Sequence, residues 1–515
     1  MPFLDWVNKN QAVQTSDDVP YHLLQHKKTY GDKDAAKDNL IIQGDNLQAL
    51  KALLPFYTGK VKCIFIDPPY NTQSAFVHYD DKLEHSQWLS TMYPRLVLLR
   101  ELLEEGGSLW ITIDDDEAHY LKVMCDEVFG RSNFVANVVW QKKFSPQNDA
   151  KWLSDMHDHI LIYAKNKSVW RPNKLKILDG SKQERGVDDG DLRGKWLSVD
   201  YTCNKNMLER PNLYYAITNP NTLEEIYPKE TAVWRFSLER HLQNVADNTV
   251  YWGKNGTNKV PRYKNFKSVS NDVIVPTTVW LHQDVGNTQE AKKEVTIFDP
   301  SAPFSTPKPE RLIERILHIG TVEGDLVLDS FLGSGTTAAV AHKMNRRYIG
   351  IEMGEHAQTH CIPRLQKVID GEQGGISKTV EWQGGGGFSF YTLGDAVFDA
   401  EGHITSDVRF KDLAAYIWWL ETKTATGVKI AKVSSPFIGE REGVAYYLLY
   451  NGILGDRRPN GGNVLTSGVL AYLKELHPHS GKKVIFGEAS RLGQARLAAE
   501  QIEFKQIPYE LHDRV

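Results

Sequence analysis

The sequence is poor in cysteine, with 4 among its 515 residues. These residues, Cys63, Cys125, Cys203 and Cys361, are scattered and form no C-x-x-C pair. Their spacing argues against a cysteine-ligated zinc site or a disulfide framework, and it favours a reducing compartment. Long apolar runs are also lacking. None approaches the ~20 residues that cross a bilayer, and residues 1–11 lack the apolar core of a signal peptide. We therefore expect a soluble cytoplasmic protein with no membrane partner.

Neither sign of charge is in excess. Lysine and arginine total 61, aspartate and glutamate total 65, and the formal net charge is −4. The protein is therefore not a uniformly basic nucleic-acid binder, and any contact with DNA must come from a local patch. The rest of the composition is ordinary for a globular protein, 41% hydrophobic and 24% charged. The length suits about two to four domains.

The stretch around Asp67 is the first candidate site. Val61–Ile66 is rich in β-branched and aromatic residues, which predicts a strand buried on both faces. Pro68 and Pro69 end this strand, because proline has a fixed φ and no N–H to donate. A carboxylate, a stiff backbone and the ring of Tyr70 are thereby held at the carboxyl end of a buried strand, where open α/β sheets bind ligands.

This geometry suits the exocyclic amino group of a nucleobase, which is a poor nucleophile because its lone pair is delocalised into the ring. Asp67 and the Pro68 carbonyl could each accept one N–H, and a flipped-out base could stack on Tyr70. The alternative is a Pro-Pro turn with Tyr70 as a core aromatic, and the four residues alone leave both interpretations open. The polar, aromatic-bearing residues 71–85 follow the site and are expected to form a lid or to contact DNA.

A second candidate site follows another predicted strand, residues 325–328. The next turn contains Gly333 and Gly335, which let the backbone approach a ligand closely, and the helix after it points free N–H groups at the same place. A further strand ends in Glu352, whose carboxylate could hold two ribose hydroxyls. The spacing also satisfies the dinucleotide fingerprint, so the glycines do not choose between NAD and another nucleoside cofactor.

Polar residues around this turn favour a cofactor with a zwitterionic amino-acid tail over a cofactor with a pyrophosphate. Asp329 precedes the turn, and Thr336 and Thr337 follow its second glycine. A carboxylate at this place would repel a pyrophosphate. A methyl-sulfonium donor and a base-amino acceptor explain both candidate sites, whereas NAD explains only one. We therefore favour methyl transfer to an amino group.

Residues 166–297 lose the periodicity of the flanking segments and are predicted to form an inserted module. Residues 254–267 hold five basic side chains and no acid, with aromatic residues between the cations. Such a surface can pair phosphates and stack bases, and the alternative is a solvated basic loop. The predicted DNA-binding residues are Lys254, Lys259, Arg262, Tyr263, Lys264 and Lys267.

Two motifs, in their order along the chain, carry a resemblance to a known family. Residues 67–72 (Asp-Pro-Pro-Tyr-Asn-Thr) and 331–337 (Phe-Leu-Gly-Ser-Gly-Thr-Thr) resemble the β class of DNA amino-methyltransferases. That class places the catalytic motif first, then the target recognition domain, then the cofactor motif. The resemblance covers residues from about 40 to 370. Three further stretches are similar to modification (Mod) subunits of type III restriction-modification systems: residues 88–95, 112–115 and 306–311.

The resemblance implies S-adenosylmethionine (SAM) as methyl donor and N6 of adenine in duplex DNA as acceptor. It assigns the catalytic role to Asp67, Pro68, Pro69 and Tyr70, with Tyr70 stacking on the flipped base. The implied cofactor residues are Asp45 near the adenine, Lys308 in a covering segment with Pro309 and Glu310, Asp329, Phe331, Gly333, Gly335, Thr336 and Thr337 toward the methionine end, and Glu352 at the ribose. Asp45 is also explained as a simple helix cap. Gln73 stands where many relatives carry glycine, so the acceptor loop is expected to differ in shape.

The resemblance allows a homodimer and a restriction (helicase-nuclease) subunit as further partners. Several alternatives remain open. Cytosine N4 methylation uses the same chemistry, although Asp rather than Ser at position 67 favours adenine. Methylation of a protein glutamine amide would place the cofactor motif first, and an NAD oxidoreductase would leave the Asp67 site unexplained. A DNA-recognition subunit with decayed catalysis is a non-enzymatic alternative, against which the intact motif residues argue.

The predicted fold is α/β: a Rossmann-like SAM-dependent methyltransferase fold with a circularly permuted motif order and a mostly parallel sheet. A helix over residues 88–103 is expected to end at Gly106 and Gly107. The acids at 114–117 are predicted to be a solvated helix start without chemistry. The expected domains are an N-terminal lead-in (1–39), a methyltransferase domain (40–165 and 298–372), a target recognition domain (166–297) and, after glycine-rich spacers, a C-terminal α/β domain (388–515).

Overall fold

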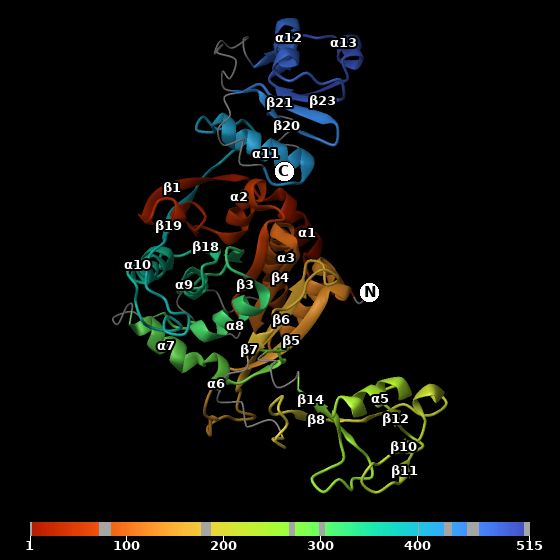
Figure 1. Ribbon diagram of the computed structural model, residues 1–515. Coiled ribbons are helices and arrows are strands. Elements are labelled where there is room, and N and C mark those ends of the chain that lie inside the picture. The colour runs from red at the N-terminus through yellow and green to blue at the C-terminus, as the bar shows by residue number, and fades with distance from the viewer. Residues whose placement is uncertain are drawn as a thin grey trace. The chain divides into compact units, whose positions relative to one another are not determined.

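The computed structural model describes residues 3–71, 84–176, 187–266, 273–297, 304–399, 401–426, 435–450 and 463–508. The chain divides into two compact units. The first comprises Met1–Asn173 and Thr277–Val515, and the second comprises Lys174–Pro276 (Figure 1). Among the described residues, none of the helices combines the length and apolar character needed to cross a membrane.

A ten-stranded mixed sheet organises the first unit (Figure 1). In spatial order its strands are β1 (His22–Gly31), β19 (Gly387–Ala396), β2 (Leu40–Gln43), β18 (Arg347–Glu352), β17 (Leu326–Asp329), β3 (Val61–Ile66), β4 (Leu103–Ile113), β6 (His157–Ala164), β5 (Phe134–Gln141) and β16 (Val279–Trp280). The run from β19 to β4 is parallel, whereas β6 is antiparallel to both of its neighbours. The expected α/β class with a mostly parallel sheet is confirmed.

Helices cover both faces of this sheet, because its central strands are apolar on both sides. Side chains such as Ile64 and Ile66 of β3 pack in one core with α2 (Asn46–Tyr57), α3 (His85–Leu102) and α4 (Ala118–Cys125). On the opposite face, Gly320 of α8 (Glu310–Gly320) lies against Cys63 of β3. The helices α9 (Thr336–Lys343) and α10 (Ile362–Ile369) pack beside α8 on that face.

The strand order brings two distant parts of the sequence together. β17 and β3 are parallel neighbours, with Val327 opposite Cys63 and Leu328 opposite Ile64. Both strands therefore end at the same edge of the sheet, with Asp329 ending one and Asp67 following the other. Ligands bind at this edge in open α/β sheets.

The N-terminal residues contribute more structure than the expected lead-in. They form α1 (Lys9–Asp18) and β1, and β1 pairs antiparallel with β19 at the edge of the large sheet. The expected helix end at Gly106 and Gly107 is wrong, because α3 ends at Leu102 and both glycines lie within β4. A register shift in the pairing of β3 with β4 accommodates this early strand start.

The C-terminal residues build a second, four-stranded sheet within the first unit. Its order is β20 (Phe437–Arg441), β21 (Val444–Leu448), β23 (Lys483–Gly487) and β25 (Ile502–Gln506). The remaining elements are α11 (Phe410–Thr422), α12 (Ser467–Leu476), α13 (Gln494–Ala499), β22 (Val464–Leu465) and β24 (Ala489–Ser490). Unlike the expected separate domain from 388, this region begins with β19 in the large sheet, and its apolar core is continuous with that of α2.

The second unit, Lys174–Pro276, has a small core that includes Tyr201, Trp234 and Trp252. It is narrower than the expected 166–297, because β16, α6 (His282–Val285) and α7 (Thr288–Thr296) belong to the first unit. Its elements are β7 (Leu175–Lys176), β8 (Leu197–Asp200), β9 (Thr202–Cys203), β10 (Ile217–Thr218), β11 (Glu225–Ile226), β12 (Val233–Trp234), α5 (Leu238–Ala246), β13 (Val250–Tyr251), β14 (Arg262–Asn265) and β15 (Val273–Ile274).

Candidate active site

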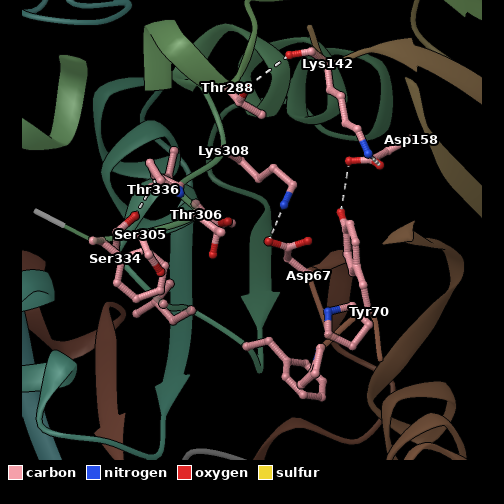
Figure 2. Close-up of a pocket in the computed structure, with 18 of the residues that line it drawn as sticks. Asp67, Tyr70, Lys142, Asp158, Thr288, Ser305, Thr306, Lys308, Ser334 and Thr336 are labelled. Carbon is pink, nitrogen blue, oxygen red and sulfur yellow. Dashed lines mark hydrogen bonds and ion pairs between the residues drawn. The ribbon is translucent and has the colours of Figure 1, made fainter. Parts of the chain in front are cut away.

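A cavity of about 620 Å³ lies at the carboxyl edge of the large sheet, and residues of both predicted motifs line it (Figure 2). Ten of the predicted site residues contribute to its wall: Asp67, Pro68, Pro69, Tyr70, Lys308, Asp329, Phe331, Gly333, Thr336 and Thr337. Asp45, Gly335 and Glu352 are not among the lining residues. The predicted acceptor and donor sites thus share one cavity.

The Asp67 carboxylate is oriented by two donors. Thr112 on β4 donates its hydroxyl to Oδ1 at 2.6 Å. The Lys308 ammonium lies 2.5 Å from Oδ2 (Figure 2). Lys308, expected among the cofactor residues, therefore forms an ion pair with the catalytic motif. The turn is also held from outside, because Trp88 donates its indole N–H to the Pro69 carbonyl at 2.8 Å. Asp67 consequently has a defined direction before any ligand binds.

The Tyr70 side chain is fixed at its hydroxyl and on its ring. The hydroxyl donates to Asp158 Oδ2 at 3.4 Å, and the Lys308 ammonium lies 5.1 Å from the ring centroid (Figure 2). Lys142 pairs with both Asp158, at 2.6 Å, and Asp155, at 2.7 Å. Burial, followed by the charge of Asp158, raises the pKa of Tyr70 well above its usual value, so the hydroxyl remains a donor.

Asp329 is buried at the end of β17 and braces the turn that follows it. Its Oδ1 accepts the backbone N–H of Phe331 at 2.9 Å, and its Oδ2 accepts the Thr337 hydroxyl at 2.6 Å. Burial raises the pKa of Asp329 to about 7, against the hydrogen bond from Thr337. The carboxyl group therefore ties the end of the strand to the first turn of α9.

The two glycines of this turn have left-handed backbone angles that favour glycine. Gly333 has φ +55°, and a Cβ there would lie 3.0 Å from Cζ of Phe304, which also lines the cavity. Gly335 has φ +81°, and its Cβ would lie 3.2 Å from the Cα of Cys361. Gly333 therefore matters for the space at the cavity wall, whereas Gly335 allows α9 and the residues after β18 to pack closely.

Glu352 and Asp45 do not line the cavity, and each accepts backbone N–H groups. Glu352 is buried, with its Oε2 accepting the N–H of Gly333 at 2.8 Å and its Oε1 accepting that of Gly354 at 3.2 Å. Asp45 caps α2 by accepting the N–H groups of Leu47 and Gln48, as the helix-cap alternative expects. In this structure Glu352 holds the backbone at Gly333 and Gly354, and Asp45 caps α2 and pairs with Arg95 at 3.2 Å.

A buried ion network supports the N-terminal and C-terminal ends of α9. Arg364 donates to the Thr336 hydroxyl at 2.8 Å and pairs with Glu310 at 2.8 Å. Lys343 pairs with the other carboxylate oxygen of Glu310, also at 2.8 Å. Glu310, expected in the covering segment, instead holds α8, α9 and α10 together.

Sequence reasoning missed several lining residues. The acids at 114–117 were predicted to have no chemistry, but Asp114 lines the cavity, and burial, with the charge of Asp116, raises its pKa to about 7. Lys142 and Asp158 also line it. The available signal for Asp114 was its position directly after a buried strand that neighbours the Asp67 strand. Asp158 had no such signal, because its role depends on the antiparallel pairing of β6.

The predicted DNA-binding stretch is only partly an exposed basic surface. Lys254 and Lys259 are exposed. Arg262 pairs with Asp200 across the sheet, and Tyr263 packs 5.0 Å from the Phe236 ring. Lys267 and residues 72–83 of the predicted lid (71–85), which include Gln73, lie outside the described residues.

Lys264 does not fit a phosphate contact. It is 5% exposed, and its ammonium lies 2.6 Å from Asp189 Oδ2. The physical reason is the alternation of β14, the central strand of a three-stranded sheet, which turns this side chain inward, where an acid compensates its charge. The sequence predicted a basic DNA-binding surface here and no strand, so it could not assign the inward position.

Comparison with known proteins places the chain in a family. A family model described as "DNA methylase" matches residues 61–362, more than half of the chain. The "probable type III restriction-modification enzyme HindVI Mod subunit" of Haemophilus influenzae is 34% identical over 405 residues, covering 69% of this chain and 54% of that protein. The StyLTI Mod subunit of Salmonella typhimurium is 34% identical over 367 residues, which cover 65% of this chain and 54% of that protein.

Among solved structures, the cytosine-N4-specific PvuII DNA methyltransferase aligns with a TM-score of 0.36 and 13% identity, covering 67% of this chain and 90% of that one. The chain spans about half the length of the first two curated relatives, 54% in each case. The family match extends from the strand before Asp67 to the residues after Glu352, and so includes every part of the cavity's two motifs. The chain belongs to the DNA methylase family.

Proposed function

We propose that this protein is a SAM-dependent DNA methyltransferase that methylates N6 of adenine in duplex DNA. One observation carries the proposal: the motif at residues 67–70 and the turn at residues 331–337 line the same cavity. An adenine amino group and a nucleoside cofactor bound at these two segments would share one cavity, as direct group transfer requires. The relatives named as Mod subunits support a modification role.

The acceptor side of the mechanism rests on Asp67. Each carboxylate oxygen has two acceptor positions, so Asp67 can accept an N–H of the adenine amino group while it keeps Thr112 and Lys308. This hydrogen bond and one to the Pro68 carbonyl would turn the nitrogen lone pair away from the ring system. Tyr70, held at its hydroxyl by Asp158, would present its ring to the flipped base.

The residues on the donor side fit SAM. When bound, SAM supplies an electrophilic methyl group on a sulfonium. The cavity wall on this side contains Gly333, which leaves space for a ligand, and the aromatic rings of Phe304 and Phe331. The N-terminal end of α9, with Thr336, also lies there. A Cβ at Gly333 would occupy space at this wall, which agrees with a cradle for a ligand. Asp329, Glu352 and Asp45 would act by holding the surrounding loops.

The proposal is tested by expressing the chain in cells without other DNA methylation and sequencing their DNA by a method that detects both N6-methyladenine and N4-methylcytosine. We expect N6-methyladenine at a single short motif. N4-methylcytosine would support the rival acceptor, and the absence of methylation with a purified, SAM-binding protein would contradict the proposal.

We also propose that duplex DNA is bound together with a restriction subunit, and that two copies of the chain form a homodimer. Support for the restriction partner comes from the names of the relatives alone. Sedimentation of the purified chain with and without a helicase-nuclease subunit would test both assemblies.

We propose the second unit as the target recognition domain, with its exposed Lys254 and Lys259 making phosphate contacts. We expect that replacing Lys254 and Lys259 with Ala weakens binding to specific and random duplexes alike and lowers the slope of log affinity against log salt by about two. The methylated motif should not change. The matched control is a double variant of two other exposed lysines of this unit, Lys205 and Lys229. Equal slopes for the two double variants would contradict the prediction.

The segment between β5 and β6 offers a second DNA contact, beside the cavity. Lys143 and Asp155 of this segment line the cavity, while Trp152 and Leu153 are 84% and 91% exposed. The ammonium of Lys151 lies 5.2 Å from the Trp152 ring. Large apolar side chains next to a site for a flipped base can fill the space that the base leaves in the duplex.

Replacing Trp152 with Ala is therefore expected to weaken binding of a normal duplex by about tenfold, within the range for one base–aromatic stack. A duplex with a mismatch at the target adenine should recover most of this loss, because less unstacking is required. Binding titrations of both duplexes measure the effect, with Tyr472→Ala, another exposed aromatic, as control. Equal losses on both duplexes would show that Trp152 does not assist flipping.

A further inference from the structure

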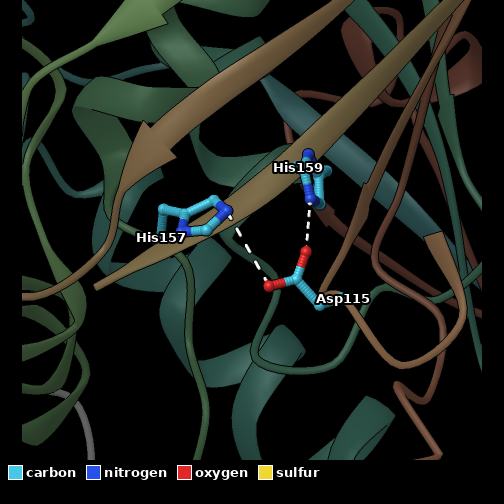
Figure 3. A group of neighbouring side chains, drawn as sticks. All are labelled: Asp115, His157 and His159. Atoms are coloured by element: carbon cyan, nitrogen blue, oxygen red, sulfur yellow. Dashed lines mark hydrogen bonds and ion pairs between the residues drawn. The ribbon is translucent and has the colours of Figure 1, made fainter. Parts of the chain in front are cut away.

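A cluster of three ionisable side chains lies at the start of β6, outside the cavity. It consists of Asp115, His157 and His159, and we name it the β6 cluster (Figure 3). His159 Nε2 lies 2.8 Å from Asp115 Oδ1, and His157 Nε2 lies 3.9 Å from Asp115 Oδ2. One ligand atom from each residue lies within 4.8 Å of the other two. The three side chains thus point at a common place.

Strand alternation separates this cluster from the cavity. Successive residues of a strand face opposite sides, so His157 and His159 share one face of β6, while Asp158 between them faces the cavity. The antiparallel register pairs Ile113 of β4 with His159. Asp115 lies in the turn two residues after β4 ends, and its carboxylate faces both imidazoles.

We propose that the β6 cluster binds one transition-metal dication of the Zn²⁺ type. Two imidazoles and a carboxylate form a common zinc ligand set, which leaves one position for water. With metal–ligand bonds of ~2.0–2.1 Å, tetrahedral zinc separates its ligand atoms by about 3.3 Å. The observed separations of 2.8 and 3.9 Å lie on either side of this value, so small side-chain rotations accommodate the ion.

A partner behind the cluster orients one of the ligands. His159 Nδ1 lies 3.3 Å from the side-chain oxygen of Asn137 on β5 and 3.0 Å from its nitrogen. With the amide oxygen toward the ring, Nδ1–H donates to Asn137 and the Nε2 lone pair points at the cluster. Such a second hydrogen bond to a ligating histidine fixes its tautomer and direction.

Exposure in the cluster fits an ion that enters from solvent. The Asp115 side chain is 65% exposed and that of His157 is 36% exposed, whereas that of His159 is 10% exposed. His119 is a neighbour, with its ring centroid 6.2 Å from that of His159. The simpler interpretation is an Asp–His hydrogen bond without metal, and the experiment must separate the two.

The bound ion would brace the strand that carries Asp158. His157 and His159 flank Asp158, which accepts the Tyr70 hydroxyl on the other face. This consequence rests on the proposed function, but metal binding itself does not. Binding is therefore measured without DNA or SAM.

The experiment uses the full chain with His477 and His479 both replaced by Gln, because Glu440, His477 and His479 form a second cluster in the described residues that could take the same ion. Equilibrium dialysis with Zn²⁺, and absorption spectra with Co²⁺ as a probe of ligand geometry, are recorded. We expect one ion per chain. Asp115→Asn and His157→Gln should each abolish this binding, and Asn137→Ala should weaken it about tenfold.

His119→Gln serves as the matched control and should retain the ion. Asp115 is exposed, so its Asn variant is expected to fold, and far-ultraviolet circular dichroism confirms this for each variant. Absence of stoichiometric binding, or binding that persists in Asp115→Asn and His157→Gln, would overturn the proposal. If the ion binds but methyl transfer is absent in all forms, the metal site stands and the proposed function fails.

Discussion

Replacing Asp67 with Asn should reduce methyl transfer by at least about 100-fold, while the affinity for SAM stays within a few-fold. The physical reason is that Asp67 is the anionic acceptor placed for the adenine amino group, whereas the donor side of the cavity is built from β17 and α9. An amide keeps the shape of the side chain but loses its negative charge and replaces one acceptor oxygen with a donor. The Lys308 ammonium, which lies 2.5 Å from Asp67 Oδ2, would then lose its anionic partner. Single-turnover transfer of a labelled methyl group and equilibrium dialysis with labelled SAM measure the two quantities.

Two further variants sharpen this prediction. Thr112→Val keeps the Asp67 charge and removes only the 2.6 Å hydrogen bond that orients it, so we expect a loss of about tenfold in rate. Asp370→Asn, at an exposed acid after α10, should change neither rate nor affinity. Loss of SAM binding in Asp67→Asn would mean that this carboxylate serves the donor and not the acceptor.

Gly333→Val should lower the affinity for SAM by at least about tenfold, which corresponds to ~1.4 kcal/mol. A side chain at Gly333 starts 3.0 Å from the Phe304 ring at the cavity wall, so it takes space that the ligand needs. The same residue also has to adopt φ +55°, where a β-branched side chain is strained. Binding of DNA should remain nearly unchanged, because Gly333 belongs to the segment proposed for the donor and not to the segments proposed for DNA.

Gly324→Val is the matched control for Gly333→Val. Gly324 has φ +81°, and nothing lies within 4 Å of a Cβ built there. Both variants therefore carry backbone strain, but only one obstructs the cavity. Thermal melting separates the loss of stability, expected in both, from the loss of SAM binding, expected only in Gly333→Val. Equal SAM affinities in the two variants would show that the Gly333 turn does not contact the cofactor.

Local sequence signals predicted the elements of the site well where one short segment contains all the information. Val61–Ile66 is a strand as predicted, because a run of apolar β-branched residues between breakers has few other stable solutions. The glycine turn lies between β17 and α9 as predicted, and Gly333 and Gly335 have the left-handed angles that only glycine adopts easily. These features depend on neighbours in sequence.

Features that depend on pairing between distant segments were missed or misplaced. Lys308 was predicted among the cofactor residues, and this role stays a prediction, but the sequence did not show that its ammonium pairs with Asp67. Lys264 was assigned to phosphate, but its strand position buries it against Asp189. In each case the sequence shows the charged residue but does not show which residue it pairs with in the fold, and that partner determines the direction of the side chain.

The sequence by itself determined the chemistry that is available: an acid and two prolines after a buried strand, a glycine turn after another, and their order along the chain. The tertiary structure alone decided how these parts are used. The parallel pairing of β17 with β3 places both motifs on one cavity, and the antiparallel β6 turns Asp158 toward Tyr70 and His157 and His159 away from it. The physical reason is that local residue type restricts backbone angles and polarity, whereas strand order and register, set by burial of the whole sheet, decide which side chains meet.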